Sequence, residues 1–181
     1  MNTLSFGLLC ILATDNYTGY DLMLKIQPFW HAKHSQIYPL LAALEKDGLV
    51  QYEEVAQSDK PDKKIYSITE KGHSEVKHWI AQPTAEPVSR DEMLLKAYCI
   101  NIVDVDVIQT LFNEREQMYN EKMFIYTTYL NNLNKLMAVN QEKLDIHSPK
   151  FGFYIILKKA ISNTESNLEW CQWVKNLINQ D

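Results

Sequence analysis

The chain of 181 residues has the composition of a water-soluble globular protein, with 46% hydrophobic and 23% charged residues and only 5 Gly and 6 Pro. Its length can hold one ordinary domain, or a small domain with a helical extension. The formal net charge of −5 argues against tight non-specific binding of nucleic acids, because that binding depends on phosphates neutralised by Lys and Arg. No apolar run reaches the roughly 18–20 residues of a membrane span.

Three cysteines, Cys10, Cys99 and Cys171, lie far apart, each in an apolar helical context. This spacing predicts reduced core thiols in a cytoplasmic protein, rather than a disulfide framework or a structural zinc site. The apolar stretch 4–12 has no basic segment before it, and polar residues stand where a small-residue cleavage site would follow. We therefore expect a buried first helix here, and not a signal peptide.

The N-terminal 48 residues contain three apolar stretches with helical spacing. After the first, turn-forming residues at 15–19 lead into a second helix, roughly 19–26, which Pro28 ends. The third helix has the clearest pattern, since its apolar positions form one stripe: Ile37, Leu40, Leu41 and Leu44.

The bounds of this third helix follow from three residues. Ser35 is a good N-cap, and Gly48 is a typical C-terminal stop. Pro39 would clash deeper in a helix, so the helix should begin close to residue 35.

The hydrophobic period then changes from helical to alternating. Two short apolar segments, 50–55 and 65–68, flank a polar stretch that contains Pro61, which predicts a β-hairpin. Thr69 should cap a fourth helix with Val76, Trp79 and Ile80 on its apolar side. Three helices, a hairpin and a helix within about 80 residues are typical of a winged helix-turn-helix. We therefore predict a DNA-binding domain over residues 1–82.

The second half of the chain is expected to be helical. Residues 82–89 resemble a linker with two prolines, and helices follow at about 90–100, 104–140 and from 148 onward. The long helix carries a coiled-coil-like seam at Tyr119, Met123, Tyr126, Leu130, Leu133 and Met137. Two long helices with wide apolar faces need a further partner, and a second copy of the chain is the natural one. The predicted fold class is mainly α with a small β wing, with residues 83–181 as a helical dimerisation domain that could also bind a ligand.

A helix-turn-helix lays the start of its second helix in the major groove. Here that start is polar, and its side chains can contact phosphates or base edges: Lys33, His34, Ser35, Gln36 and Tyr38. The tip of the wing adds Lys60, Lys63 and Lys64 for a neighbouring phosphate or the minor groove. These lysines could equally be solvated edge protection. Residues 1–83 hold eight Lys against ten Asp or Glu, so the predicted contact depends on where the charges lie.

Metal and catalytic sites are not expected. His31 and His34 have a spacing that could ligate a metal, but the sequence nearby holds no carboxylate or cysteine to complete the site. The chain has no Gly-rich phosphate loop, no nucleophile elbow and no paired carboxylates in an apolar stripe. We therefore predict no cofactor and no enzymatic activity.

Several segments resemble the signature of the PadR family of transcriptional regulators. They are HSQIYPLL at 34–41, LEKDGLV at 44–50, KIYSITEKG at 64–72 and GYDL at 19–22. The likeness continues through RDEMLLKAY at 90–98 and FGFY at 151–154, so it covers most of the chain and resembles the longer subgroup. It implies a homodimeric repressor with a winged helix and a helical dimerisation domain. In that subgroup, phenolic acids such as p-coumaric or ferulic acid release the operator of a phenolic acid decarboxylase gene.

The sequence also offers aromatic residues for such an inducer near the expected domain junctions: Tyr20, Phe29, Trp30, Tyr98 and Tyr154. Lys96 or His31 could pair the carboxylate of the inducer. The aromatic residues could equally belong to an ordinary core. The alternative to a DNA-binding regulator is a winged helix used as a protein-interaction module, which would show no salt-sensitive binding of duplex DNA.

Overall fold

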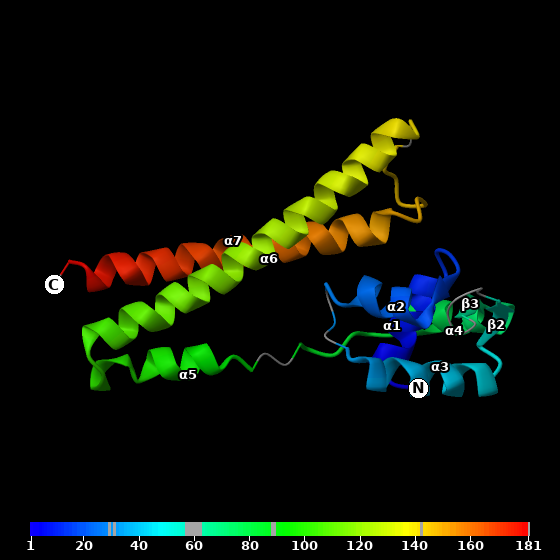
Figure 1. Ribbon diagram of the computed structural model, residues 1–181, viewed down its shortest axis with the longest axis horizontal. Helices are drawn as coiled ribbons and strands as arrows, with labels where there is room; N and C mark the ends of the chain where they lie inside the picture. Colours follow the sequence, from blue (N-terminus) through cyan, green and yellow to red (C-terminus); the bar gives the residue numbers. More distant parts are fainter. Residues whose placement is uncertain (29, 31, 57–62, 88–89, 142, 181) are drawn as a thin grey trace. The chain divides into compact units, whose positions relative to one another are not determined.

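The computed structural model describes residues 1–28, 30, 32–56, 63–87, 90–141 and 143–180. The chain divides into two compact units, Met1–Glu86 and Pro87–Asp181, which are described separately. The first unit contains, in chain order, α1 (Thr3–Leu12), β1 (Tyr17–Thr18), α2 (Gly19–Ile26), α3 (His34–Lys46), β2 (Val50–Val55), β3 (Lys63–Ile68) and α4 (Glu70–Ile80) (Figure 1). The helices, the hairpin and the last helix follow in the predicted order, and the winged-helix fold class is confirmed.

The sheet has one strand more than the sequence predicts. Its order is β1-β3-β2, with both pairs antiparallel, so β3 is the central strand. Residues 17 and 18, expected within a turn, form β1 because Tyr17 and Thr18 pair with Tyr66 and Ile65 of β3. The edge of β3 that β2 leaves open supplies the backbone partners of β1. A strand of two residues has too short a sequence pattern to be predicted from the chain alone.

The N-cap of helix α3 lies two residues earlier than predicted. Lys33, and not Ser35, occupies the N-cap with an extended backbone. The side-chain Oε1 of Gln36 accepts the Lys33 N–H at 3.0 Å, which satisfies one backbone donor at the start of the helix. At the other end, Gly48 has a φ of +70°, and the N–H of Leu49 donates to the Leu44 carbonyl at 2.9 Å. This is the Schellman ending that favours glycine.

The core of the first unit lies between the helices and the inner face of the sheet. Its fully buried members come mostly from the three N-terminal helices: Leu8, Leu9, Leu12, Leu22, Ile26, Ile37, Leu41 and Leu44. Thr69 caps α4 as predicted, since its Oγ1 accepts the Gly72 N–H at 3.1 Å. Gly72 also allows close packing, because a Cβ there would lie 2.3 Å from the Leu49 carbonyl oxygen.

The second unit is a pair of long antiparallel helices with a short helix at one end (Figure 1). It contains α5 (Glu92–Tyr98), a 3₁₀ turn η1 (Ile100–Ile102), α6 (Val105–Val139) and α7 (Phe151–Ile178). The seam predicted on the long helix faces α7, where Tyr119, Leu133 and Met137 are buried. Helix α5 is shorter than the predicted segment 90–100, and α7 begins a few residues after the predicted start at 148.

Two separate apolar clusters hold this helical pair together. One contains Met93 of α5 with Phe112, Tyr119 and Cys171. The other, nearer the connection between the long helices, contains Leu133, Met137 and Leu157. Within the part of the chain that the structure describes, no helix is long and apolar enough to cross a membrane.

Candidate nucleic-acid interface

The first turn of α3 presents a polar surface to solvent. Its residues 33–36 and Tyr38 are exposed, whereas Ile37, Leu41 and Leu44 are buried on the opposite side. Helical spacing therefore separates an inner apolar stripe from an outer polar face. All five residues predicted for DNA contact on this helix lie on that outer face or at its start.

Three aromatic rings are stacked beside this turn. His34 lies between Tyr20, whose ring centre is 5.8 Å away, and Tyr38, at 6.0 Å. Tyr20 comes from α2 and is 52% exposed, so the stack stands on the surface. Gly19 makes room for it, because a Cβ at that position would lie 2.8 Å from the ring of Tyr38. The stack links the first turn of α3 to the start of α2.

The β2–β3 hairpin forms the wing, and contacts within it restrain the side chain of one of its lysines, Lys64. The Lys64 ammonium lies 3.7 Å from the ring centre of Tyr52 and 3.9 Å from a carboxylate oxygen of Glu54. A hydrogen bond to the Tyr52 side chain is the main cause of a raised Lys64 pKa. Lys63 is exposed at the first residue of β3. Lys60, also predicted to contact DNA, lies outside the described residues.

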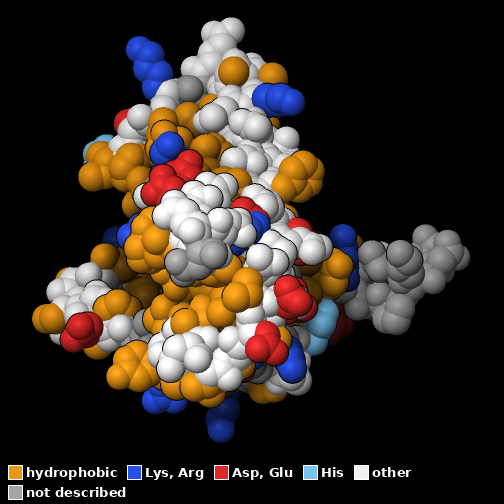
Figure 2. Space-filling model, turned by 90° about the vertical axis from the view of Figure 1, so that its left-hand side faces the viewer, with side chains coloured by type: hydrophobic (Ala, Val, Ile, Leu, Met, Phe, Trp, Pro, Cys, Tyr) orange, Lys and Arg blue, Asp and Glu red, His pale blue; other side chains and the backbone are white. Residues whose placement is uncertain are grey.

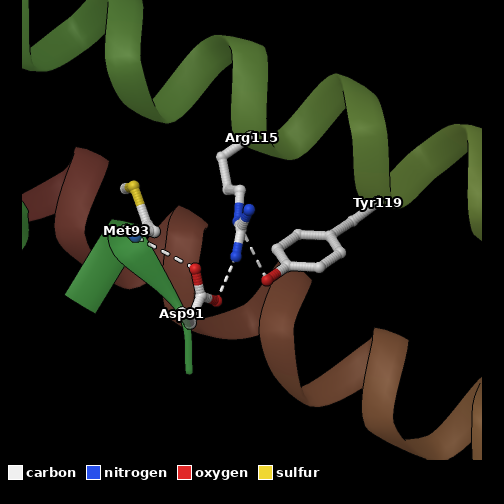
Figure 3. Close-up of polar contacts among 4 residues, drawn as sticks. All are labelled: Asp91, Met93, Arg115 and Tyr119. Atoms are coloured by element: carbon white, nitrogen blue, oxygen red, sulfur yellow. Dashed lines mark hydrogen bonds and ion pairs between the residues drawn. The ribbon is translucent and has the colours of Figure 1, made fainter. Parts of the chain in front are cut away.

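A polar cluster ties α5 to α6 in the helical unit (Figure 3). Asp91 is the N-cap of α5, and its Oδ1 accepts the Met93 N–H at 3.0 Å. Its other carboxylate oxygen pairs with the guanidinium of Arg115. Arg115 also donates through Nε to the Tyr119 hydroxyl at 3.0 Å. One carboxylate thus caps a helix and holds that helix against its neighbour.

The helical unit leaves much apolar surface uncovered within one chain. The face seen in Figure 2 carries wide hydrophobic areas. Large exposed hydrophobic residues occur on all three of its α-helices, among them Leu95, Tyr98, Phe124, Val139 and Trp173. Uncovered apolar area of this extent is typical of a protein interaction surface.

Comparison with known proteins identifies the family. The model of the transcriptional regulator PadR-like family matches residues 8–78, and that of the virulence activator alpha C-terminal domain matches residues 89–179. A negative transcriptional regulator PadR from Bacillus subtilis is 32% identical over the full length of both chains. The chain belongs to the PadR-like family of transcriptional regulators.

Solved structures of the Bacillus subtilis PadR extend this likeness to the fold of the whole chain. Its complex with operator DNA matches with a TM-score of 0.80 and 29% identity, over 98% of this chain and 99% of that one. Its complex with p-coumaric acid matches with a TM-score of 0.74 and 27% identity, over 98% and 99%. The PadR resemblance and the function predicted from the sequence, transcriptional regulation, are therefore confirmed.

Among the residues that the structure describes, the aromatic residues predicted for an inducer are not gathered into one group within either unit of this PadR-like chain. In the first unit, Tyr20 stacks on His34, and Trp30 is 45% exposed. Phe29 and His31 lie outside the described residues.

In the helical unit, Tyr154 packs in the cluster around Leu157, whereas Tyr98 is 87% exposed on α5, which packs on the other cluster. The Lys96 ammonium pairs with Glu92 at 2.7 Å, one helical turn away. The length of α6, about 50 Å at 1.5 Å per residue, explains how the two clusters come to be separate.

The sequence missed two features of this arrangement. The partnership of Tyr20 with His34 joins two helices, and no spacing along either helix indicates it. The Asp91–Arg115 pair likewise joins α5 to α6, and no local pattern indicates it. Among the described residues, no group of three or more His, Cys, Asp or Glu could hold a metal ion.

Proposed function

We propose that this protein binds operator DNA as a repressor, with the first turn of α3 in the major groove. The observation that carries the proposal is the exposed polar face of α3, at residues 33–36 and Tyr38, on a helix whose opposite side is buried. Backbone and side-chain donors at such a turn suit phosphates and base edges. The complex of the Bacillus subtilis relative with operator DNA supports the same role.

Of the two wing lysines that the structure describes, Lys63 contributes more in this proposal. Lys64 is already engaged by Tyr52 and Glu54, so a phosphate would have to compete with both. Residues 1–83 also hold eight Lys against ten Asp or Glu, so one copy of the DNA-binding domain alone should bind DNA poorly.

A homodimer overcomes this weakness by joining two such domains. The exposed apolar surface of the helical unit supports self-association. Each protomer would present α3 to one half of a pseudo-palindrome, with the half-sites about one helical turn, or 34–36 Å, apart. We assign dimerisation to the unit Pro87–Asp181 and DNA binding to Met1–Glu86. The protein would act in the cytoplasm, by binding and not by catalysis.

A small aromatic acid is the proposed signal that releases the DNA. The support is the complex of the Bacillus subtilis PadR with p-coumaric acid. The aromatic contacts expected from the sequence stay predictions, and Lys96 would have to leave Glu92 to pair a carboxylate. Operator-bound protein titrated with a panel of phenolic acids tests this assignment. Retained binding with every compound would refute the sensor and leave the DNA-binding role intact.

The decisive experiment for DNA binding is a salt titration of affinity for a duplex selected from a random pool. Lys33→Ala should weaken binding across sequences and lower the slope of log affinity against log salt by about 1.8 for two phosphates per dimer. Lys63→Ala should act in the same way. Lys159→Ala, an equal loss of charge on exposed α7 surface, is the matched control. An unchanged slope in both test variants would refute the proposed DNA-binding surface at Lys33 and Lys63.

A further inference from the structure

The side-chain amide of Gln36 has a fixed direction. Its Oε1 accepts the main-chain N–H of Lys33 at 3.0 Å. A backbone N–H can only donate, so the amide oxygen must face it and the NH₂ group must face away. Gln36 is exposed, and the group it offers to a ligand is therefore a pure hydrogen-bond donor.

The surroundings of Gln36 favour this orientation. The Lys33 N–H is one of the donors that a helix leaves unpaired at its start, and turning the amide would remove its side-chain acceptor. The preceding His34 is held in the stack with Tyr20 and Tyr38, which links this turn to α2. The first turn of α3 is thus ordered by contacts of its own before any DNA arrives.

We propose that Gln36 selects guanine, and discriminates against adenine, at one position of each half-site. This inference rests on the proposed binding of α3 in the major groove. A glutamine that pairs with adenine uses its oxygen and its nitrogen together, because adenine presents an acceptor beside an amino donor. The oxygen of Gln36 faces the Lys33 N–H and not the base, and its outward NH₂ would meet a second donor, the amino group, at the 6-position of adenine. Guanine presents two adjacent acceptors, N7 and O6, which match a donor.

Two substitutions of Gln36 separate the effect of its outward NH₂ donor from the effect of its oxygen, which accepts the Lys33 N–H. Gln36→Glu keeps an oxygen for the Lys33 N–H and turns the outward group into an acceptor. Gln36→Ala removes both. Duplexes are selected from a random pool by the full-length wild type and by each variant, and the affinities for the winning sequences are compared at fixed salt.

The wild type should enrich guanine at one position per half-site, where a change to adenine weakens binding about five- to tenfold. 7-Deazaguanine lacks the N7 acceptor but keeps the O6 that adenine lacks, so replacing that guanine by 7-deazaguanine should weaken binding less than the change to adenine. Gln36→Ala should lose the preference there, and Gln36→Glu should shift it to cytosine, whose amino group donates.

Three results would overturn the inference. The donor-only assignment is wrong, while DNA binding stands, if the wild type prefers adenine at a position where the Gln36 variants lose that preference. It is equally wrong if neither variant changes the base preference at any position. If the wild type selects no sequence and shows no salt-sensitive binding of duplexes, the proposed function fails together with this inference.

Discussion

The Asp91 carboxylate performs two structural tasks, and substitutions can measure each separately. It caps α5 through the Met93 N–H and pairs with Arg115 on α6 (Figure 3). Loss of an N-cap costs about 1 kcal/mol. The ion pair is partly buried, with side chains 31% and 23% exposed, so it should contribute about 1 kcal/mol, at the upper end for exposed pairs. Asp91→Ala should therefore lower the free energy of unfolding by about 2 kcal/mol.

Asp91→Asn is the matched comparison, because asparagine caps a helix as well as aspartate but carries no charge. It should cost only about 1 kcal/mol. In a double-mutant cycle with Arg115→Met, the coupling between the two sites should also be about 1 kcal/mol. The Arg115 variant additionally loses the hydrogen bond to the Tyr119 hydroxyl.

Urea unfolding followed by tryptophan fluorescence can report on the helical unit alone. Trp170 packs against Phe112 in the same cluster as Met93 and Tyr119, with ring centres 5.2 Å apart. Replacing Trp30 and Trp79 by Phe removes the signal from the first unit. Protein concentration must be held constant, because a dimer gains stability with concentration. If Asp91→Asn costs as much as Asp91→Ala, or if the coupling is zero, the division into cap and ion pair is wrong.

Three further predictions concern packing, thiol chemistry and the wing. Gly72→Ala should lower the free energy of unfolding by about 2–3 kcal/mol, because its Cβ would meet a main-chain carbonyl at 2.3 Å. Gly152→Ala, with open space around it, should be neutral or raise stability by up to about 1 kcal/mol; equal losses would refute the packing argument. Burial raises the pKa of the Cys171 thiol, so alkylation at pH 8 should be slow in the folded protein and fast in urea, and equal rates would contradict its placement. Lys64→Ala should change the salt slope of DNA binding less than Lys63→Ala, and the reverse order would show that the contacts of Lys64 do not restrain it.

Sequence patterns were sufficient for most elements of the first unit. The stripe of Ile37, Leu41 and Leu44 indicated both α3 and its buried side, and burial follows that stripe. Gly48 marked the end of the helix through its left-handed backbone, which is a local property. The N-cap of α3 was misplaced by two positions, at Ser35 instead of Lys33, because the side chain of Gln36, the third residue of the helix, accepts the Lys33 N–H.

The candidate site was only partly predictable. Its polar turn at residues 33–36 follows from helical spacing alone. The place of Tyr20 beside His34 required two helices to meet, and the restraint on Lys64 required β2 to lie next to β3. The inducer site proposed from aromatic residues along the chain stays a prediction. In the helical unit, Tyr154 packs in the cluster around Leu157, whereas Tyr98 is exposed on α5.

The sequence by itself determined the order of elements, the apolar faces and the family signature, because periodicity, capping and turn chemistry act over a few neighbouring residues. Tertiary structure decided the third strand β1, the stacking of Tyr20 on His34 and the Asp91–Arg115 pair, because these join segments distant in the chain. The outward donor of Gln36 comes from a local hydrogen bond to Lys33, and it depends on which of two nearby groups caps the helix. Such choices are settled by contact geometry, which residue patterns along the chain do not contain.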